Sequence, residues 1–517
     1  MIKRKQQVVL LILDGWGIAP VGPGNAIELA RKPNFDKLWQ KYPHTQLFAH
    51  GHYVGLPDSQ IGNSEAGHMN IGAGRKVKQD SVLISDAIAD GRFHKNLALN
   101  QTIDFVKKNG SSLHLLGMIS EKDSPHSSLE HLYALIDLAV ERKVKNVYLH
   151  LITDGRDSPQ FSALKTIDAI AEKANWRASI VTIMGRFYGM DRGKNWSRIE
   201  SAYDSLTTCK GPRRTNYRDA VLHAYNQGIT DEYIEPTLIG KTKIDCAHTR
   251  IKDDDGIIFF NLRSDRARQL AKCFVQKGFN KLNPGAFKRK VVLDNIVFCA
   301  FTDFGPDFGE ILTAFPSPEV KNTLPLILKE KTQLYIAETE KYAHVTYFMN
   351  GGYADPVNGE QRIRIPSLKV RSYAEKPEMS VYKITKKVAD YVRNDYEFIA
   401  VNFANPDMVG HTGDLRATIK AIEHVDVCLG KLSEIILKRK ATLIVTADHG
   451  NAEKMLDLET DEIWTGHTTN KVPFVLVGDE FRGVKLHKGN LGNIAPTVYR
   501  VFDMKKLPKK INSPLFN

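Results

Sequence analysis

Short runs of apolar, largely β-branched residues recur along the chain, and several of them lead into an acidic side chain. Three runs share this pattern: Val8–Leu13 before Asp14, Phe398–Val401 before Asp407, and Leu443–Val445 before Asp448. A continuous apolar run of this length is typical of a strand that is buried on both faces of a parallel sheet. Open α/β sheets keep their sites at the carboxyl ends of such strands. We therefore expect these acidic residues to meet at one edge of a sheet.

A second group of apolar runs alternates with amphipathic segments in the middle of the chain. Five expected strands share this setting: Leu113–Met118, Val147–Ile152, Ile180–Met184, Ile257–Asn261 and Ile296–Phe301. Helices are expected at about 127–142 and 161–175, and Ser127 with Glu130 has capping-box spacing at the start of the first. This alternation of strand and helix predicts a parallel α/β sheet.

The positions of the candidate acidic side chains indicate how the chain divides. They fall near both ends, so one domain has to be discontinuous, with a second inserted into it. At 517 residues the chain also exceeds what one hydrophobic core usually supports. We expect two α/β domains, residues 1–78 with 312–517 and residues 79–311. The second linker, near 304–311, contains Gly305-Pro306-Asp307-Phe308-Gly309, which suits the hinge of a cleft that opens and closes.

Composition narrows the class of protein. Hydrophobic residues make up 42% of the chain and charged residues 25%, which is ordinary for a globular protein. The five cysteines are odd in number and widely spaced, which favours reduced thiols in a cytoplasmic protein over a disulfide scaffold. The start resembles a signal peptide, but its apolar run ends at Asp14, so a buried first strand is expected instead. No stretch of sequence approaches the ~20 apolar residues of a membrane span.

The formal net charge of +13 allows a nucleic-acid-binding interpretation. Against it, the sequence has no recognition motif, no basic low-complexity tail and no repeated aromatic–basic pattern. An excess of this size is more typical of surface composition, with some electrostatic steering of anionic substrates. We expect a monomer that acts on a small molecule and has no nucleic-acid or membrane partner.

Seven side chains from distant segments could together bind two divalent ions: Asp14, Ser64, Asp407, His411, Asp448, His449 and His467. Asp407 and His411 are four residues apart, so a helical turn would place both on one face, and His467 would complete that site. The other four would form a second site. A single aspartate or histidine could equally be structural, but the set favours ligation. Mixed carboxylate and imidazole ligation suits Mn²⁺, Zn²⁺, Co²⁺ or Fe²⁺ better than Ca²⁺.

Ser64 lies in Gly62-Asn63-Ser64-Glu65, at an expected junction of loop and helix. A serine at a helix start can expose its hydroxyl beside backbone N–H groups, and those N–H groups favour an anion. A metal ion beside it would lower its pKa and make a nucleophile available near neutral pH. The alternative is that Ser64 is simply the N-cap of the helix. Beside the aspartates and histidines, we favour the nucleophile.

Arginines follow several of the strands expected in the insert: Arg156, Arg186, Arg192, Arg263 and Arg266. The planar guanidinium group suits bidentate recognition of carboxylate and phosphate. Any one of these arginines could instead form a surface ion pair. As a group, they predict a site for a small anion.

The motifs that carry these residues resemble a known family along nearly the whole chain. They are LLILDGWG (10–17), GNSEAGHMNIGAGR (62–75), TDGRD (153–157), GRFYGMDR (185–192), RSDRARQ (263–269), AETEKYAHVTYFMNGG (337–352), NFANPDMVGHTG (402–413), TADHGNAEK (446–454) and GHTTN (466–470). In this order they resemble the cofactor-independent phosphoglycerate mutases, which belong to the alkaline-phosphatase-like metalloenzymes. The resemblance implies an alkaline-phosphatase-like metal domain that is discontinuous, with an inserted α/β phosphotransferase domain.

The resemblance also implies an activity and a role for each candidate residue. The reaction would interconvert 3-phosphoglycerate and 2-phosphoglycerate through a phosphoserine on Ser64, with two divalent ions, most commonly Mn²⁺, and without 2,3-bisphosphoglycerate. Asp157 would handle the proton of the substrate hydroxyl, and Lys341 would neutralise charge near the phosphoryl group. The implied substrate-binding set is His126, Arg156, Asp157, Arg186, Arg192, Arg263, Arg266 and Lys341.

The loop around His126 departs from the family pattern. The family usually carries Gly-Gly-Val-His-Ser-His there, whereas this chain reads Asp123-Ser124-Pro125-His126-Ser127-Ser128. A metal-dependent phosphatase or sulfatase-like hydrolase could use the same serine and metals. An arginine-lined insert favours the mutase, because it would retain glycerate against water between the two transfers.

Overall fold

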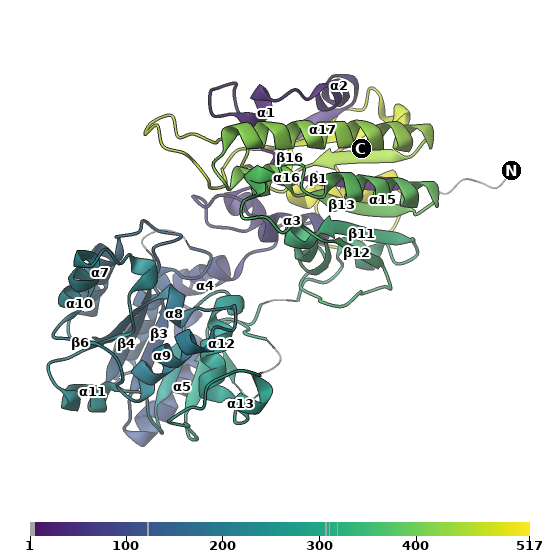
Figure 1. Cartoon of the computed structure of the whole chain (residues 1–517). Coiled ribbons are helices and arrows are strands. Elements are labelled where there is room, and N and C mark those ends of the chain that lie inside the picture. The colour runs from purple at the N-terminus through teal and green to yellow at the C-terminus, as the bar shows by residue number, and fades with distance from the viewer. Residues whose placement is uncertain (1–5, 121–123, 306–307, 310, 318) are drawn as a thin grey trace. The chain divides into compact units, whose positions relative to one another are not determined.

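The computed structural model describes residues 6–120, 124–305, 308–309, 311–317 and 319–517. The chain forms two compact units, each with its own sheet (Figure 1). Unit 1 comprises Met1–Gln79 with Glu319–Asn517, and unit 2 comprises Asp80–Pro318. The sequence predicted these boundaries after residues 78 and 311. Of the residues that carried the loop and hinge predictions, Asp123, Pro306 and Asp307 lie outside the described parts of the chain.

The described strands of unit 1 form a mixed sheet with N- and C-terminal segments interleaved at its centre. In sheet order, they are β12 (Gln361–Ile365), β11 (Gln333–Glu338), β13 (Phe398–Phe403), β1 (Val8–Leu13), β14 (Thr442–Thr446), β15 (Val472–Val477), β2 (His44–Phe48) and β16 (Gly489–Asn490). β1 pairs in parallel with both β13 and β14, so that Val8 lies opposite Phe398 on one side and Thr442 on the other. The apolar run of β1 is fully buried, as its lack of alternation predicted.

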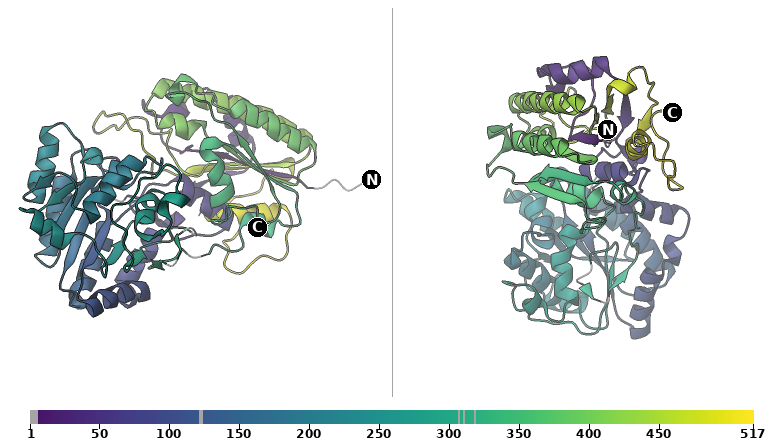
Figure 2. Two further views of the ribbon diagram at one scale, coloured as in Figure 1. Left: turned by 60° about the horizontal axis from the view of Figure 1, so that its bottom comes forward. Right: turned by 90° about the vertical axis from the view of Figure 1, so that its right-hand side faces the viewer.

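Helices cover this sheet on its two sides (Figure 2). One group is α1 (Ala26–Leu29), α2 (Pro33–Lys41), α15 (Val381–Arg393), α16 (Asn405–Gly410) and α17 (Leu415–Lys438); the other includes α3 (Ser64–Ala73), α14 (Leu324–Ile327) and α18 (Ile494–Val501). Among the helices in the described parts of the chain, none combines the length and the apolar surface that a membrane crossing requires.

Unit 2 carries a sheet in which six described strands run parallel, as the alternating pattern predicted. In sheet order, its strands are β10 (Leu312–Thr313), β9 (Val297–Ala300), β8 (Gly256–Phe259), β3 (Leu113–Met118), β4 (Val147–Thr153), β5 (Ser179–Gly185), β7 (Thr237–Ile239) and β6 (Arg213–Arg214). Only the β5–β7 pairing among them is antiparallel. Parallel order brings the carboxyl ends of β3, β4, β5 and β8 to one edge.

The helices of unit 2 are α4 (Asp80–Ala89), α5 (Leu97–Asn109), α6 (Leu129–Glu141), α7 (Ala163–Ala174), α8 (Arg186–Gly189), α9 (Trp196–Thr207), α10 (Tyr217–Asn226), α11 (Lys243–Thr249), α12 (Ser264–Val275) and α13 (Phe279–Leu282). The predicted capping box at the start of α6 is wrong. Ser128 is the N-cap and makes no side-chain cap hydrogen bond, and the hydroxyl of Ser127 is buried without a partner among the described residues. The spacing was right, but the helix begins one residue later than the box requires.

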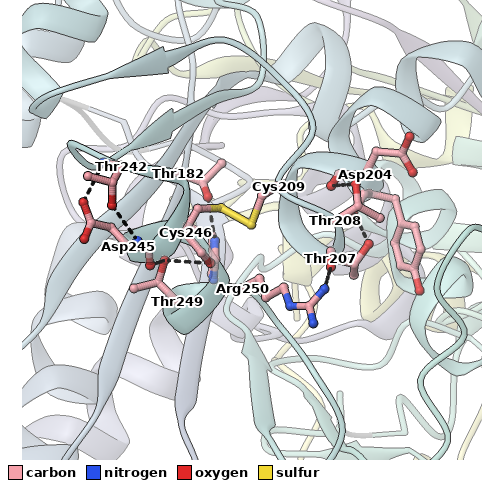
Figure 3. The surroundings of a disulfide bond; sticks show 12 residues. Thr182, Asp204, Thr207, Thr208, Cys209, Thr242, Asp245, Cys246, Thr249 and Arg250 are labelled. Carbon is pink, nitrogen blue, oxygen red and sulfur yellow. Dashed lines mark hydrogen bonds between the residues drawn. A yellow bond between two sulfur atoms is a disulfide. The ribbon is translucent and has the colours of Figure 1, made fainter.

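A disulfide joins Cys209, just beyond α9, to Cys246 on α11 (Figure 3). The prediction that all five cysteines are reduced thiols is therefore wrong for this pair, whereas Cys273, Cys299 and Cys428 are free and buried. The two paired residues are 37 positions apart, and the sequence contains no signal that the end of α9 and α11 meet. Arg250 reinforces this junction by donating to the carbonyl of Thr207 (3.4 Å).

Candidate active site

Three neighbouring strands of unit 1 deliver acidic residues to one sheet edge. Asp14 directly follows β1, and its backbone N–H donates to the carbonyl of Phe403 at the end of β13 (3.1 Å). Asp407 lies in the first turn of α16, which begins just beyond β13. Asp448 follows β14, and one of its carboxylate oxygens accepts from the N–H of Gly15 (3.3 Å). The parallel register of β1, β13 and β14 therefore places the three carboxylates side by side, as the apolar runs predicted.

Ser64 is the first residue of α3, and the N-cap is its neighbour Asn63. The side chain of Asn63 accepts from the N–H of Ala66 (2.9 Å), which is the bond that a capping serine would have made. The alternative that Ser64 is the N-cap is therefore wrong. Its buried hydroxyl lies 2.9 Å from Nε2 of His449 and 3.4 Å from a carboxylate oxygen of Asp14. The hydroxyl is thus aimed at the acidic edge instead of at its own helix.

Lys341 places a positive charge at the centre of this cluster. Its Nζ donates to Asp14 (2.6 Å), to Ser64 (2.8 Å) and to Asp407 (2.6 Å). Burial alone would lower the pKa of Lys341, but Asp14, Asp407 and Asp448 raise it. The side chain is therefore held as an ammonium. It lies in the short 3-10 turn Thr339–Lys341 at the end of β11, a fourth strand of the same edge.

Three imidazoles complete the cluster. Nε2 of His411 and Nε2 of His467 lie 3.3 Å and 3.1 Å from the same oxygen of Asp407, and the ring of His449 stacks on that of His467 at 3.8 Å. The four-residue spacing of Asp407 and His411 predicted their shared face, and the N–H of His411 donates to the Asp407 carbonyl (2.9 Å). Asp407, His411 and His467 form one group whose ligand atoms lie within 4.8 Å of one another, and Asp14, Asp407 and His449 form another.

The carboxylates that crowd together in this buried site differ in their pKa values. Burial, together with the charges of Asp448 and Asp407, raises the pKa of Asp14 to about 7, although Lys341 opposes this shift. Burial would also raise the pKa of Asp407, but Lys341, His411 and His467 bring it well below its usual value. Burial lowers the pKa of His449 and of His467, so both imidazoles are held neutral. A neutral imidazole beside an ionised carboxylate is the state in which both can bind a cation.

Two buried residues that the sequence reasoning missed connect these ligands. Nδ1 of His68 lies 3.2 Å from Asp448, and its Nε2 lies 3.1 Å from the side-chain nitrogen of Asn402. Asn402 in turn donates to Asp14 (2.6 Å). His68 is four residues from Ser64 on α3, and Asn402 is the penultimate residue of β13. Those positions could have revealed both, because they lie one turn from the serine and at the same strand end.

In unit 2, Arg186 binds two aspartates at the carboxyl end of β4. Its Nη1 donates to Asp154 (2.5 Å) and to Asp157 (2.8 Å), while Asp157 also accepts from the hydroxyl of Ser124 (3.0 Å). Asp154 further accepts from the hydroxyl of Ser120 (3.1 Å) and from two backbone N–H groups of its own loop. Burial would raise the pKa of Asp157, but Arg186 lowers it, helped by His126 and Ser124. Asp154 and Ser124 were not singled out in the sequence.

The remaining arginines lie close to one another. Arg192 pairs with Asp265 (3.0 Å), and Nε of Arg263 lies 4.0 Å from the other oxygen of Asp265. Burial, together with the charges of Arg186, Arg192 and Arg156, lowers the pKa of Arg266 to about 10, and Asp265 opposes this shift. Arg156 lies 3.9 Å from Glu232. Positive charges held this close together favour the binding of an anion.

His126 belongs to the same cluster. Burial, together with the nearby charges of Arg263 and Arg186, lowers its pKa to about 3. Its Nδ1 is buried without a hydrogen-bond partner among the described residues, and its backbone N–H donates to the hydroxyl of Ser124 (3.2 Å). His126 is therefore a neutral imidazole beside the arginines.

Comparison with known proteins places this geometry in a family. Residues 6–506 match the model of the metalloenzyme superfamily. A 2,3-bisphosphoglycerate-independent phosphoglycerate mutase of Clostridium beijerinckii is 45% identical over 501 residues, covering 96% of each chain. One of Moorella thermoacetica is 44% identical and covers 98% of this chain and 97% of its own. The chain belongs to this family of metalloenzyme mutases.

A solved structure supports membership in the mutase family along both units. The crystal structure of Leishmania mexicana phosphoglycerate mutase at low cobalt concentration is 28% identical, with a TM-score of 0.81. The match covers 99% of this chain and 98% of that chain. The resemblance inferred from the nine motifs is thus confirmed, and so is the prediction of an α/β metalloenzyme.

Proposed function

We propose that this mutase interconverts 3-phosphoglycerate and 2-phosphoglycerate, with Ser64 as the residue that carries the phosphoryl group between the two positions. The observation that carries the proposal is the surroundings of the Ser64 hydroxyl. It lies within hydrogen-bond distance of His449 and Lys341, beside Asp14, and at the first turn of α3. A helix N-terminus favours the phosphate that a phosphoserine would place there.

The side chains around Ser64 fit divalent metal ions. Three carboxylates and three imidazoles converge at this edge, a mixed donor set that suits divalent ions. Asp407, His411 and His467 would hold one ion, and Asp14, Ser64, Asp448 and His449 would hold the other. When bound, divalent ions lower the pKa of a serine hydroxyl and neutralise phosphoryl charge. Carboxylate with imidazole suits Mn²⁺, which we propose as the ion used.

In the first transfer, the oxygen of Ser64 attacks the phosphorus atom of 3-phosphoglycerate. The bond between phosphorus and the substrate oxygen breaks, which leaves phosphoserine and glycerate. Lys341, an ammonium within 2.8 Å of that serine oxygen, stabilises the negative charge that develops on the phosphoryl group. The second transfer reverses this chemistry, with the 2-hydroxyl of glycerate as the attacking group.

We assign glycerate and its proton to the residues of unit 2. The positive charges of Arg156, Arg186, Arg192, Arg263 and Arg266 suit a carboxylate and a phosphate. The pKa of Asp157 is lowered, so its carboxylate is available to accept a proton from the attacking hydroxyl and to return one to the leaving oxygen. His126, as a neutral imidazole, would accept or donate a hydrogen bond without adding charge.

Three finer assignments are also proposals. We expect Mn²⁺ as the metal, a monomer as the assembly, and the cytoplasm as the location. The three free cysteines agree with a reducing compartment, whereas the Cys209–Cys246 disulfide weighs against one.

The direct test is conversion of 3-phosphoglycerate by the purified protein in the absence of 2,3-bisphosphoglycerate. We expect 2-phosphoglycerate to form, to stop forming when a chelator removes the metal, and to reappear with Mn²⁺. Rapid quenching and peptide mapping should locate phosphate on Ser64, and folded Ser64→Ala should neither turn over nor become phosphorylated. Release of inorganic phosphate with little 2-phosphoglycerate would instead indicate a hydrolase. Substantial turnover by metal-loaded Ser64→Ala would overturn the nucleophile assignment.

A further inference from the structure

Glu453 is a buried carboxylate that no step of the proposed reaction uses. It lies in the loop beyond β14 and is 3% exposed. One oxygen accepts from the backbone N–H groups of Gly17 (3.1 Å) and Asn451 (2.8 Å). The other accepts from the side-chain nitrogen of Asn470 (3.0 Å) and from the hydroxyl of Thr468. Four donors from three loop segments thus converge on one side chain.

Each of these segments carries a candidate metal ligand. Gly17 lies three residues after Asp14, Asn451 follows Asp448 and His449, and Thr468 follows His467 directly. Asn451 extends the connection, because its side-chain nitrogen donates to Asp407 (2.9 Å). Glu453 is therefore bonded to loops beyond the ends of β1, β14 and β15. There, isolated bridges between Ile18 and Lys471 and between Gly450 and Thr468 replace the regular strand pairing.

The backbone is closely fitted around this carboxylate. A Cβ atom at position 17 would lie 2.1 Å from the carboxyl carbon of Glu453, and one at position 450 would lie 2.3 Å from its Oε1. Both positions are glycine, which allows the two loops to approach the carboxylate from opposite segments of the chain. A glutamine of the same shape could not satisfy all four donors, because its amide nitrogen is itself a donor.

From these contacts we propose that Glu453 is a positioning residue that holds the loops of Asp14, His449 and His467 in register for metal binding. This inference rests on the proposed function, since it concerns the ligands assigned there. The effect acts through the ligands and not on the substrate. Loss of partners that orient metal ligands typically weakens metal binding by 10–100-fold, and we expect that range for Glu453→Gln. The turnover number at saturating metal should fall by about 3-fold or less, because the reacting groups themselves are unchanged.

The test measures Mn²⁺ binding to metal-free protein by calorimetry, beside kcat at increasing Mn²⁺. Two variants probe the contact: Glu453→Gln removes the charge, and Thr468→Val removes one donor without changing the size of the side chain. Glu360→Gln is the matched control. Glu360 is also buried in unit 1 and also accepts from two backbone N–H groups and one asparagine side chain, but its hydrogen-bond partners Asn350, Val357, Asn358 and Arg362 lie in one local segment.

We expect weaker Mn²⁺ binding in Glu453→Gln and, to a smaller degree, in Thr468→Val, with wild-type affinity in Glu360→Gln. Excess Mn²⁺ should restore kcat in both affected variants. Wild-type Mn²⁺ affinity in Glu453→Gln would overturn the proposal, and if that variant does not fold, wild-type affinity in Thr468→Val would do so. Failure of the wild-type protein itself to bind Mn²⁺ would instead contradict the proposed function, so the two failures are distinguishable.

Discussion

At the scale of single residues, the mutase has two charged clusters of opposite character, one around Lys341 in unit 1 and one around the arginines of unit 2. In unit 1, the ammonium of Lys341 is surrounded by carboxylates whose total charge exceeds its own. In unit 2, Arg192 and Arg263 both lie beside Asp265, and burial together with its like-charged neighbours lowers the pKa of Arg266 to about 10. One cluster therefore favours added cations and the other favours an added anion. The predictions for individual side chains follow from this contrast.

Replacing Arg266 with alanine should separate binding from stability. Each charge-assisted contact to an anion contributes about 1.5–3 kcal/mol, so kcat/KM should fall by about 10–10²-fold. The melting temperature should be unchanged or higher, because the substitution removes repulsion among the arginines. Steady-state kinetics and thermal unfolding measure the two effects. Arg218→Ala, which breaks an exposed pair with Asp168, is the control and should leave kcat/KM unchanged. Equal kinetics in both variants would show that Arg266 is a surface residue without a role in binding.

His126 should make the folded protein sensitive to acid. Its pKa is lowered from 6.5 to about 3, so between these values the unfolded state binds a proton that the folded state does not. Stability from this group is therefore full above pH 6.5 and is lost as the pH falls toward 3. When the pH falls from 7 to 5, the free energy of unfolding should decrease by about 2 kcal/mol less in His126→Asn than in the wild type. Denaturant unfolding at both pH values measures this, and parallel losses in the two proteins would contradict it.

At the scale of elements, the first turn of α3 sets the position of the nucleophile. Asn63 caps the helix, which leaves the hydroxyl of Ser64 free to face the metal ligands. Asn63→Ala should cost about 1 kcal/mol of stability and should lower kcat by about 10-fold or more, because a frayed first turn misplaces the serine. Asn96→Ala removes the equivalent cap of α5 and should cost similar stability with no change in kcat. Normal kcat in Asn63→Ala would mean that the sheet edge alone positions Ser64.

The disulfide between the end of α9 and α11 should stabilise unit 2. It closes a loop with a sequence separation of 37 residues, for which loop closure corresponds to about 2–4 kcal/mol. Protein reduced and alkylated at Cys209 and Cys246 should therefore unfold at lower denaturant concentration, whereas the free cysteines are buried and should react only on unfolding. Thiol counting on protein alkylated inside cells measures whether the bond exists there. Five reactive thiols in the denatured protein would show that the bond does not form in that compartment.

The sequence pattern predicted the strands correctly, but it did not predict the cap of α6 or the disulfide. Unbroken apolar runs predicted β1, β13 and β14, and parallel pairing then determined that Asp14, Asp407 and Asp448 would meet. Family motifs supplied the rest of the candidate site. Glu453 and Asp154 were not predictable in this way, because their importance lies in which donors surround them after folding. The Cys209–Cys246 pair was missed for the same reason, since separation along the chain does not report separation in space.

At the scale of the whole molecule, the two units carry different parts of the proposed chemistry. Residues 80–318 have their own sheet and core, so this segment should fold when expressed alone. It should unfold cooperatively and retain the disulfide, yet show no mutase activity and no high-affinity Mn²⁺ binding, because the nucleophile and the metal ligands belong to unit 1. Circular dichroism, calorimetry and the mutase assay test this fragment. Mutase turnover by residues 80–318 alone would contradict the assignment of Ser64 and its partners.

The place of β1 at the centre of its sheet has a consequence for how the protein is made. β1 pairs with β13 and β14, which begin at Phe398 and Thr442. A ribosome adds about 5–20 residues per second, so β1 leaves the exit tunnel roughly 20–80 s before its first partner is synthesised. Unit 2 is complete within that interval and can fold as it emerges. The nascent chain therefore carries a folded middle segment and an apolar strand that has to be shielded, for example by a chaperone, until the last third of the chain arrives.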